Sequence, residues 1–151
     1  MNNEDTLTLM PCIIDCDADP VPRKRINVED HKKGGQLSFD PSKVVLHLSG
    51  LQKRGKAIGG WEFFKELASM PVLNVNVLDF LLANPHLIPD EWKYAENGQA
   101  RVIFFYGTTY RNMYNGLCVE SLWWNEHNWI NGGDWVGRLV HSNEAAALYI
   151  S

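Results

Sequence analysis

The segment from residue 99 to 140 constrains the fold more than any other part of the chain. Its apolar residues follow the period of two that is typical of a β-strand, whereas those before it follow the period of a helix. Asn115-Gly116 is the strongest hairpin signal in the sequence, because a type I′ turn needs positive φ at both central residues. Polar residues 125–128 mark a second turn. We therefore predict a three-stranded antiparallel meander over this segment.

A two-residue turn fixes the register that we predict for the first hairpin. It sets Arg111 opposite Glu120, so that the two side chains form an ion pair across the strands. It also sets Gly107 opposite Trp124, whose indole then covers the glycine. The second turn brings Trp124 to face Trp129 if its loop has two or four residues. The tryptophans are then divided between the two faces of the sheet.

Two helices precede the meander. Residues 61–69 carry apolar side chains at helical spacing, which are Trp61, Phe64, Leu67 and Ala68. Residues 75–83 are almost entirely apolar and follow Asn74, a suitable N-cap, so we expect a nearly buried helix there. Apolar runs at residues 6–16 and 43–49 predict strands. This segregation of helices from strands indicates an α+β fold, mainly an antiparallel sheet with the C-terminal three-stranded meander packed on the two central helices.

Composition narrows the class of protein. The chain has 151 residues, 45% of them hydrophobic, and we expect a single globular domain over residues 1–151. Its formal charge of −4 gives no basic field, so we expect no nucleic-acid partner. The N-terminus lacks the regions of a signal peptide, and no apolar run reaches the length of a membrane span. Three cysteines, an odd number, are typical of reduced thiols. These features favour a cytoplasmic protein without a membrane partner.

The sharpest enzymatic hint is the segment IIDCDAD at residues 13–19. It places Asp15, Asp17 and Asp19 at alternate positions after an apolar strand. Aspartates arranged in this way can attack phosphorus and hold magnesium. A metal-dependent phosphoryl or nucleotide enzyme is therefore one hypothesis, and it requires the three carboxylates to converge in a cleft. The alternative is an acidic strand end that faces water.

Residues 50–60 form a basic, glycine-rich segment that we expect to be an exposed loop. The sequence GLQKRGK approaches a phosphate-binding loop, but Ala57 stands where that pattern requires serine or threonine to hold magnesium. A solvated basic loop is the simpler interpretation. The enzyme hypothesis includes three basic side chains of this segment only as additions to the aspartate site: Lys53, Arg54 and Lys56.

The second hypothesis, which we prefer, is a binding or interaction module that needs no cofactor. Residues 121–137 contain four of the six tryptophans, separated by polar residues. Exposed indoles of this kind stack on sugars, bases or the side chains of a partner. The candidate surface, for a small ligand or a second copy of the chain, consists of Tyr106, Trp124, Trp129, Asn131, Asp134 and Trp135. The hypothesis requires two or more of these tryptophans to be exposed and clustered.

Four blocks of the sequence resemble a known family. They are HKKGGQL (31–37), DPSKVVLHLS (40–49), PVLNVNVLDFLLANPHLIPDEWK (71–93) and VIFFYGTTYRN (102–112). A family of small uncharacterised bacterial proteins is similar in sharing these blocks in this order. The resemblance covers most of the chain from residue 12 onward and implies a stand-alone bacterial protein. It implies no activity, ligand or catalytic residue.

Overall fold

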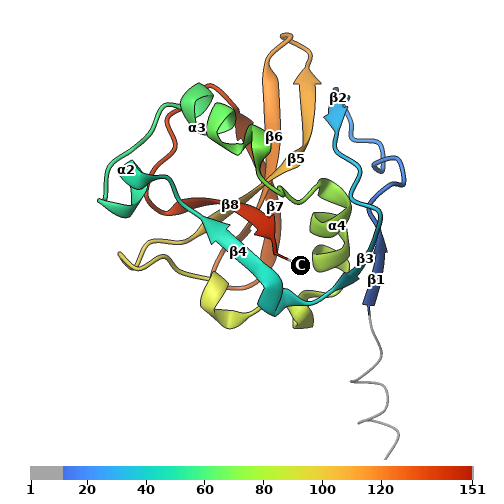
Figure 1. Ribbon diagram of the computed structural model, residues 1–151, viewed down its shortest axis with the longest axis horizontal. Helices are drawn as coiled ribbons and strands as arrows, with labels where there is room; N and C mark the ends of the chain where they lie inside the picture. Colours follow the sequence, from blue (N-terminus) through green and yellow to red (C-terminus); the bar gives the residue numbers. More distant parts are fainter. Residues whose placement is uncertain (1–11, 151) are drawn as a thin grey trace, which may run out of the picture.

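The computed structural model describes residues 12–150 as an α+β chain with mostly antiparallel strands (Figure 1). The described strands are β1 Cys12–Asp15, β2 Ile26–His31, β3 Gln36–Phe39, β4 Val44–His47, β5 Val102–Asn112, β6 Leu117–Trp124, β7 Trp129–Trp135 and β8 Glu144–Tyr149. The helices are α2 Gly50–Lys53, α3 Gly60–Glu66 and α4 Val75–Ala83. Single 3-10 turns cover Pro41–Lys43, Leu67–Ser69, Pro85–Leu87 and Asp90–Trp92. The predicted helix at residues 75–83 is confirmed, with Asn74 as its N-cap.

A six-stranded sheet forms the centre of the molecule, with β4-β8-β5-β6-β7 as its main order. Its longest strand, β5, has two different partners along one edge. β8 runs parallel to residues 102–104, and β2 runs antiparallel to residues 108–112. The β5–β6 hairpin extends from the body at the top of Figure 1, with β2 beside it. A separate two-stranded sheet, β1-β3, lies beside α4 at the right.

Strands β5, β6 and β7 are consecutive antiparallel neighbours, but the predicted register of the first hairpin is wrong. Arg111 pairs with Leu117 rather than with Glu120. The loop that joins the strands has three residues, 113–115, instead of two. Only Asn115 takes a positive φ, at 63°, so the type I′ turn that requires two such residues does not form.

A second irregularity explains the position of Gly107. The register of β5 on β6 shifts again between Phe104 and Thr109, so Gly107 does not face Trp124. It lies instead against the segment that leads into α4, where an added Cβ would be 2.7 Å from the Leu73 carbonyl oxygen. The Gly107 N–H donates to that same carbonyl at 2.9 Å. The glycine therefore lets the start of α4 approach the sheet.

The second hairpin has the predicted register. Trp124 pairs with Trp129 across β6 and β7, and the ring centroids lie 5.5 Å apart. On the opposite face the indole of Trp123 covers Gly132, because a Cβ added there would lie 3.1 Å from the indole nitrogen. An indole thus covers a glycine in this sheet, although neither residue is the one that we predicted.

The two longer helices pack on opposite faces of the sheet. α4 shares one hydrophobic cluster with Ile103 and Phe105, and α3 shares another with Phe104 and Tyr106. Neighbouring residues of a strand point to opposite faces. This part of β5 is therefore apolar on both sides and lies at the centre of the core.

Helix α3 exposes a different face from the one that we predicted. Phe63 is fully buried, whereas Trp61 is 51% exposed. The orientation follows from Gly60, where an added Cβ would lie 1.9 Å from the Val136 carbonyl oxygen. The first turn of α3 therefore packs directly on a distant backbone segment.

A short helix, α2, occupies the start of the segment that we predicted as a loop. Ser49 and Gln52 form a capping box in which each side chain accepts the backbone N–H of the other. The Gln52 amide also donates to the carbonyls of His141 and Glu144, at 2.8 and 2.6 Å. These bonds attach α2 to the start of β8. Residues 54–56 stay exposed as predicted.

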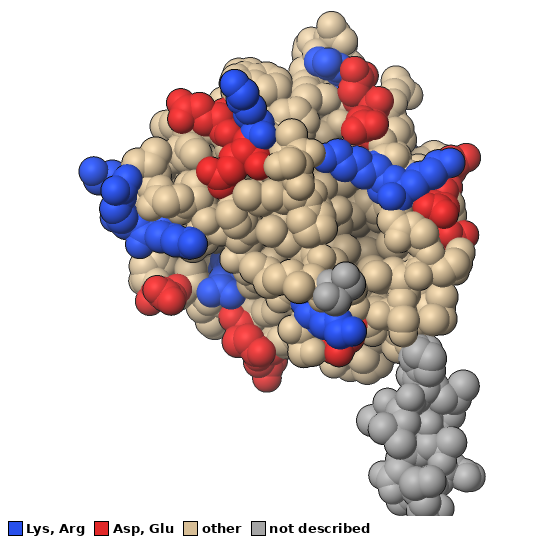
Figure 2. All heavy atoms as spheres, in the orientation of Figure 1, with Lys and Arg blue, Asp and Glu red and all other residues tan. Residues whose placement is uncertain are grey.

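Acidic and basic side chains are mixed around the rim of the face in Figure 2, and the centre of that face is uncharged. No helix in the described part of the chain has the length and apolar character that crossing a bilayer requires. Cys12, Cys16 and Cys118 are free thiols.

Candidate functional site

The six residues of the predicted aromatic surface do not lie on one face. Tyr106 is 4% exposed and belongs to the hydrophobic cluster beneath α3, so it cannot contact a ligand. Trp129 packs against the other cluster, beneath α4. The surface therefore does not exist in the form that the sequence indicated.

Trp124 and Trp129 form a half-buried pair at one end of β7. The ammonium group of Lys93 lies 4.1 Å from the Trp124 ring centroid, which is a cation–π contact. Lys93 is also paired with Asp90 at 3.1 Å. Both indoles are thus engaged within the chain, with only part of each ring left open to solvent.

Trp135 lies at the other end of β7 and is 51% exposed. Its ring stands edge to face with that of Trp61, which is equally exposed, at a centroid distance of 6.5 Å. Both rings lie against Gly137, where an added Cβ would be 2.7 Å from each of them. Two exposed, clustered tryptophans therefore exist, but Trp61 was outside the predicted set.

One edge of β7 has no neighbouring strand among residues 12–150. In an antiparallel pair, residues that bond the neighbour alternate with residues whose N–H and C=O point away from it. Val136 donates to Leu117 and Asn125 donates to Asn128, and these bonds fix the phase of the β6–β7 ladder. The peptide groups that point off the sheet are consequently those of Trp129, Asn131, Gly133 and Trp135.

The Trp135 N–H agrees with this phase. It donates to the side chain of the adjacent Asp134, at 2.9 Å, and not to β6. Asp134 also forms an ion pair with Arg138, which in turn binds Glu144 at the start of β8. Asp134 is therefore held on the α3 side of the sheet by contacts within the chain.

Asn131 belongs to a polar cluster built from distant parts of the chain. Its amide donates to Glu120 at 3.2 Å, and Glu120 accepts from Arg23 at 2.9 Å. Arg23 also donates to both carboxylate oxygens of Asp79 in α4, at 2.8 and 3.0 Å. Burial lowers the pKa of Arg23, but the hydrogen bonds to Glu120 and Asp79 outweigh that effect and raise it. The guanidinium also lies 5.8 Å from the ring centroid of Tyr110, a cation–π contact. The cluster therefore has a structural role: it links the loop after β1, α4, β6 and β7.

The three aspartates of the metal hypothesis do not converge. The Asp15 carboxylate accepts the N–H of Asp17 at 3.1 Å, and the Asp17 carboxylate accepts the N–H of Gly35 at 2.9 Å. Asp19 is exposed to solvent. In the described residues no three acidic, histidine or cysteine side chains are placed to hold a metal ion. The arrangement is that of an acidic strand end whose carboxylates cap turns, and it gives the enzyme hypothesis no support.

The basic segment is divided in the structure. Lys53 lines a cleft of about 480 Å³, whereas Arg54 and Lys56 do not. None of the three aspartates lines this cleft. The proposed partnership between the aspartates and the basic loop therefore has no geometric basis.

No protein-family model, curated protein or solved structure matches this chain. The resemblance to small bacterial proteins, and the bacterial origin that it implies, stay predictions.

Proposed function

We propose that the protein is a small interaction module that acts as a homodimer, joined through the open edges of two β7 strands. The observation that carries the proposal is the row of peptide groups at residues 129, 131, 133 and 135 that points off the sheet. An unpaired strand edge is a template for pairing with another strand, because its N–H and C=O groups are ready to bond.

The composition of β7 supports pairing. Strand edges that avoid association are short or carry lysine, proline or inward-pointing charges. β7 has seven residues, with neither lysine nor proline, and Asp134 is its only charged residue. The ion pair with Arg138 neutralises that carboxylate. Asp134 protects only one end of this edge, because its carboxylate accepts the outward N–H of Trp135. Pairing with a second strand would replace that one bond.

A second copy of the chain fits because the edge is self-complementary. A two-fold axis at Gly132 sets Trp129 opposite the partner's Trp135, and Asn131 opposite the partner's Gly133. Every pair in this register joins residues whose peptide groups point outward, as an antiparallel ladder requires. Aromatic pairs across strands add roughly 0.2–1 kcal/mol each.

Both ends of such a contact carry indoles. The exposed Trp61–Trp135 pair of one copy comes beside the Trp124–Trp129 end of the other. The pairing would therefore cover the most exposed tryptophans of the chain. It explains why these side chains are exposed in a single copy, and it requires no small ligand.

Size-exclusion chromatography with light scattering tests the proposal. The wild-type chain should have twice its 17.2 kDa mass. Asn131→Pro removes an outward N–H and should give a monomer. Asn131→Ala is the matched control: it loses the side-chain bond to Glu120 but keeps the N–H, so it should stay dimeric.

Thermal unfolding shows whether each variant is folded. If Asn131→Pro does not fold, Trp135→Lys serves instead, because that side chain is exposed and the new charge would face the partner's Trp129. A wild-type chain that stays at 17.2 kDa at high concentration, or folded variants that keep the double mass, would overturn the proposal.

We also propose a cytoplasmic location. It is supported by the free thiols of Cys12, Cys16 and Cys118, since paired cysteines are the rule in oxidising compartments.

A further inference from the structure

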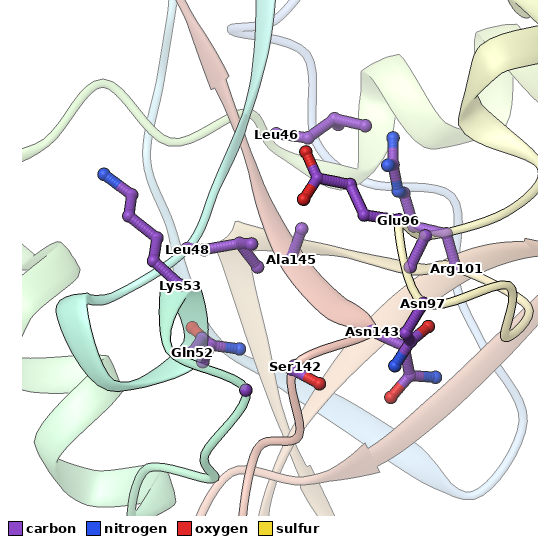
Figure 3. Close-up of a pocket in the computed structure, with 12 residues that line it drawn as sticks. Leu46, Leu48, Gln52, Lys53, Glu96, Asn97, Arg101, Ser142, Asn143 and Ala145 are labelled. Carbon is purple, nitrogen blue, oxygen red and sulfur yellow. The ribbon is translucent and has the colours of Figure 1, made fainter.

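A cleft lies between α2 and the turn at residues 95–97, beside the paired strands β4 and β8 (Figure 3). Its volume of about 480 Å³ falls within the roughly 300–1,000 Å³ of small-molecule sites. Leu46, Leu48 and Ala145 supply its apolar surface. The cleft therefore has the size and the mixed lining of a ligand site.

Three charged side chains line this cleft. Figure 3 shows Lys53 on the α2 wall and Glu96 and Arg101 on the opposite wall, with the Glu96 carboxylate directed into the space. None of the three takes part in an ion pair found among residues 12–150. The Lys53 ammonium is directed outward from the α2 wall in this view, so a positive charge lies at the rim of the cleft and a carboxylate lies inside it.

Arg101 is a half-buried charge on this wall. Burial lowers its pKa, and the nearby Glu96 offsets only part of that effect. Its guanidinium donates to the Glu91 carbonyl at 3.3 Å, which leaves other N–H donors of the guanidinium free for a ligand. A guanidinium in this position favours an acceptor oxygen in the cleft.

Two amide side chains hold the walls in place. Gln52 bonds the carbonyls of His141 and Glu144, and Asn143 donates to the Ala100 carbonyl at 2.8 Å. Both side chains join segments that are distant in the sequence. The charged groups are therefore mounted on a fixed framework, which lowers the entropy cost of binding.

We propose that the cleft binds a short zwitterionic peptide of two or three residues. Its ammonium group lies beside Glu96, its carboxylate at Lys53 on the other wall, and Arg101 donates to a peptide carbonyl. The apolar side chains of the ligand pack on Leu46 and Leu48.

The separation of the charges selects this class of ligand. In a free amino acid the ammonium and carboxylate share one carbon, whereas each further residue of a peptide moves them apart by up to about 3.6 Å. A polyanion such as a nucleotide would meet the carboxylate of Glu96. The ammonium of Lys53 on one wall and the carboxylate of Glu96 on the other therefore fit a short peptide best.

Isothermal titration calorimetry with dileucine tests the proposal. N-acetyl-dileucine lacks the ammonium group and dileucine amide lacks the carboxylate. Each should bind roughly threefold to tenfold more weakly than dileucine, the range expected for one partly exposed ion pair. Glu96→Gln should abolish the difference between dileucine and its acetylated form, and Lys53→Gln the difference between dileucine and its amide.

Lys56→Gln is the matched control, because Lys56 is close to Lys53 in sequence but does not line the cleft. It should leave binding unchanged. The cleft adjoins β4 and the proposed dimer edge is β7, at opposite ends of the sheet order, so the monomeric Asn131→Pro variant should bind dileucine as the wild type does. Absence of dileucine binding at millimolar concentration, equal binding of the blocked peptides, or an equal loss in Lys56→Gln would overturn the proposal.

Discussion

Arg23 and Glu120 lie 97 residues apart in the sequence, and their side chains form an ion pair at 2.9 Å in the folded chain. The pair is largely shielded from water, since 15% of the Arg23 side chain and 11% of the Glu120 side chain are exposed. Asp79 binds the same guanidinium from α4. One arginine therefore joins the loop after β1 to a helix and to the middle of the sheet.

Arg23→Met should destabilise the protein by about 2–4 kcal/mol, because it leaves two carboxylates near one another without their counter-ion. Urea denaturation measures the loss. Lys24→Met, at an exposed neighbouring position, should change stability by less than about 0.5 kcal/mol. A double variant with Glu120→Gln should recover part of the loss; if the two effects simply add, the ion pair does not couple the residues.

Gly60→Ala should cost about 1–3 kcal/mol or more, since its Cβ would lie 1.9 Å from the Val136 carbonyl oxygen and the backbone must move. Gly50→Ala is the control, because Gly50 also begins a helix and has open space around it. That substitution should be neutral or stabilising by up to about 1 kcal/mol. Equal urea midpoints for the two variants would show that the close packing of α3 is not needed.

Gln52→Leu should destabilise the protein by about 2–3 kcal/mol. The reason is that the backbone carbonyls of His141 and Glu144 lose the side-chain amide that donates to them. Hydrogen exchange should show faster opening of α2 in the variant than in the wild type. Arg54→Ala, at an exposed position, should leave both the exchange rates and the urea midpoint unchanged.

The thiol of Cys16 should react slowly in the folded protein. Burial, together with the charges of Asp15 and Asp17, raises its pKa from 9.0 to about 11, so little thiolate is present at pH 8. Mass spectrometry after brief treatment with iodoacetamide should find this cysteine modified mainly in urea. Fast modification of Cys16 in the native chain would contradict the buried environment.

The same shift predicts how stability depends on pH. The folded chain holds the Cys16 proton more tightly than the unfolded chain. The protonated thiol therefore makes its full contribution to the free energy of unfolding below about pH 9, and this contribution falls as pH rises toward 11. Urea midpoints measured across this range should therefore decline. Cys16→Ala should decline less steeply, since it removes the titrating group.

Local patterns were enough to predict the elements whose signals lie within a few residues of one another. Asn74 and the apolar run after it predicted α4, and the turn at residues 125–128 predicted the pairing of Trp124 with Trp129. β2 was missed because it is an edge strand without a fully buried residue, and its short apolar alternation at Ile26 and Val28 ends at a bulge before Asp30.

The first hairpin shows where such patterns fail. Asn115-Gly116 is compatible with a two-residue and a three-residue loop, and only contacts with the rest of the sheet select between them. The further register shift before Thr109 has no local signal either. The predicted ion pair was therefore misassigned: Arg111 lies 3.4 Å from Glu29, and Glu120 binds Arg23.

The candidate sites depend on the same long-range contacts. Trp61 is exposed because Gly60 packs on the backbone of Val136, and spacing along the helix cannot reveal that. The cleft joins residues from four separate segments, including Lys53 and Arg101. A cluster of aromatic residues in the sequence indicated the side chains of β7, whereas the dimer that we propose uses the backbone edge of that strand.

The place of β8 affects how the chain is made in the cell. This strand leaves the ribosome after the other described strands, yet it lies between β4 and β5. Until residues 144–149 emerge, β4 has no neighbouring strand in the main sheet, and the apolar start of β5 lacks its parallel neighbour. The nascent polypeptide therefore cannot complete its main sheet until the last described strand has emerged, and its unpaired strand edges stay open to other chains until then.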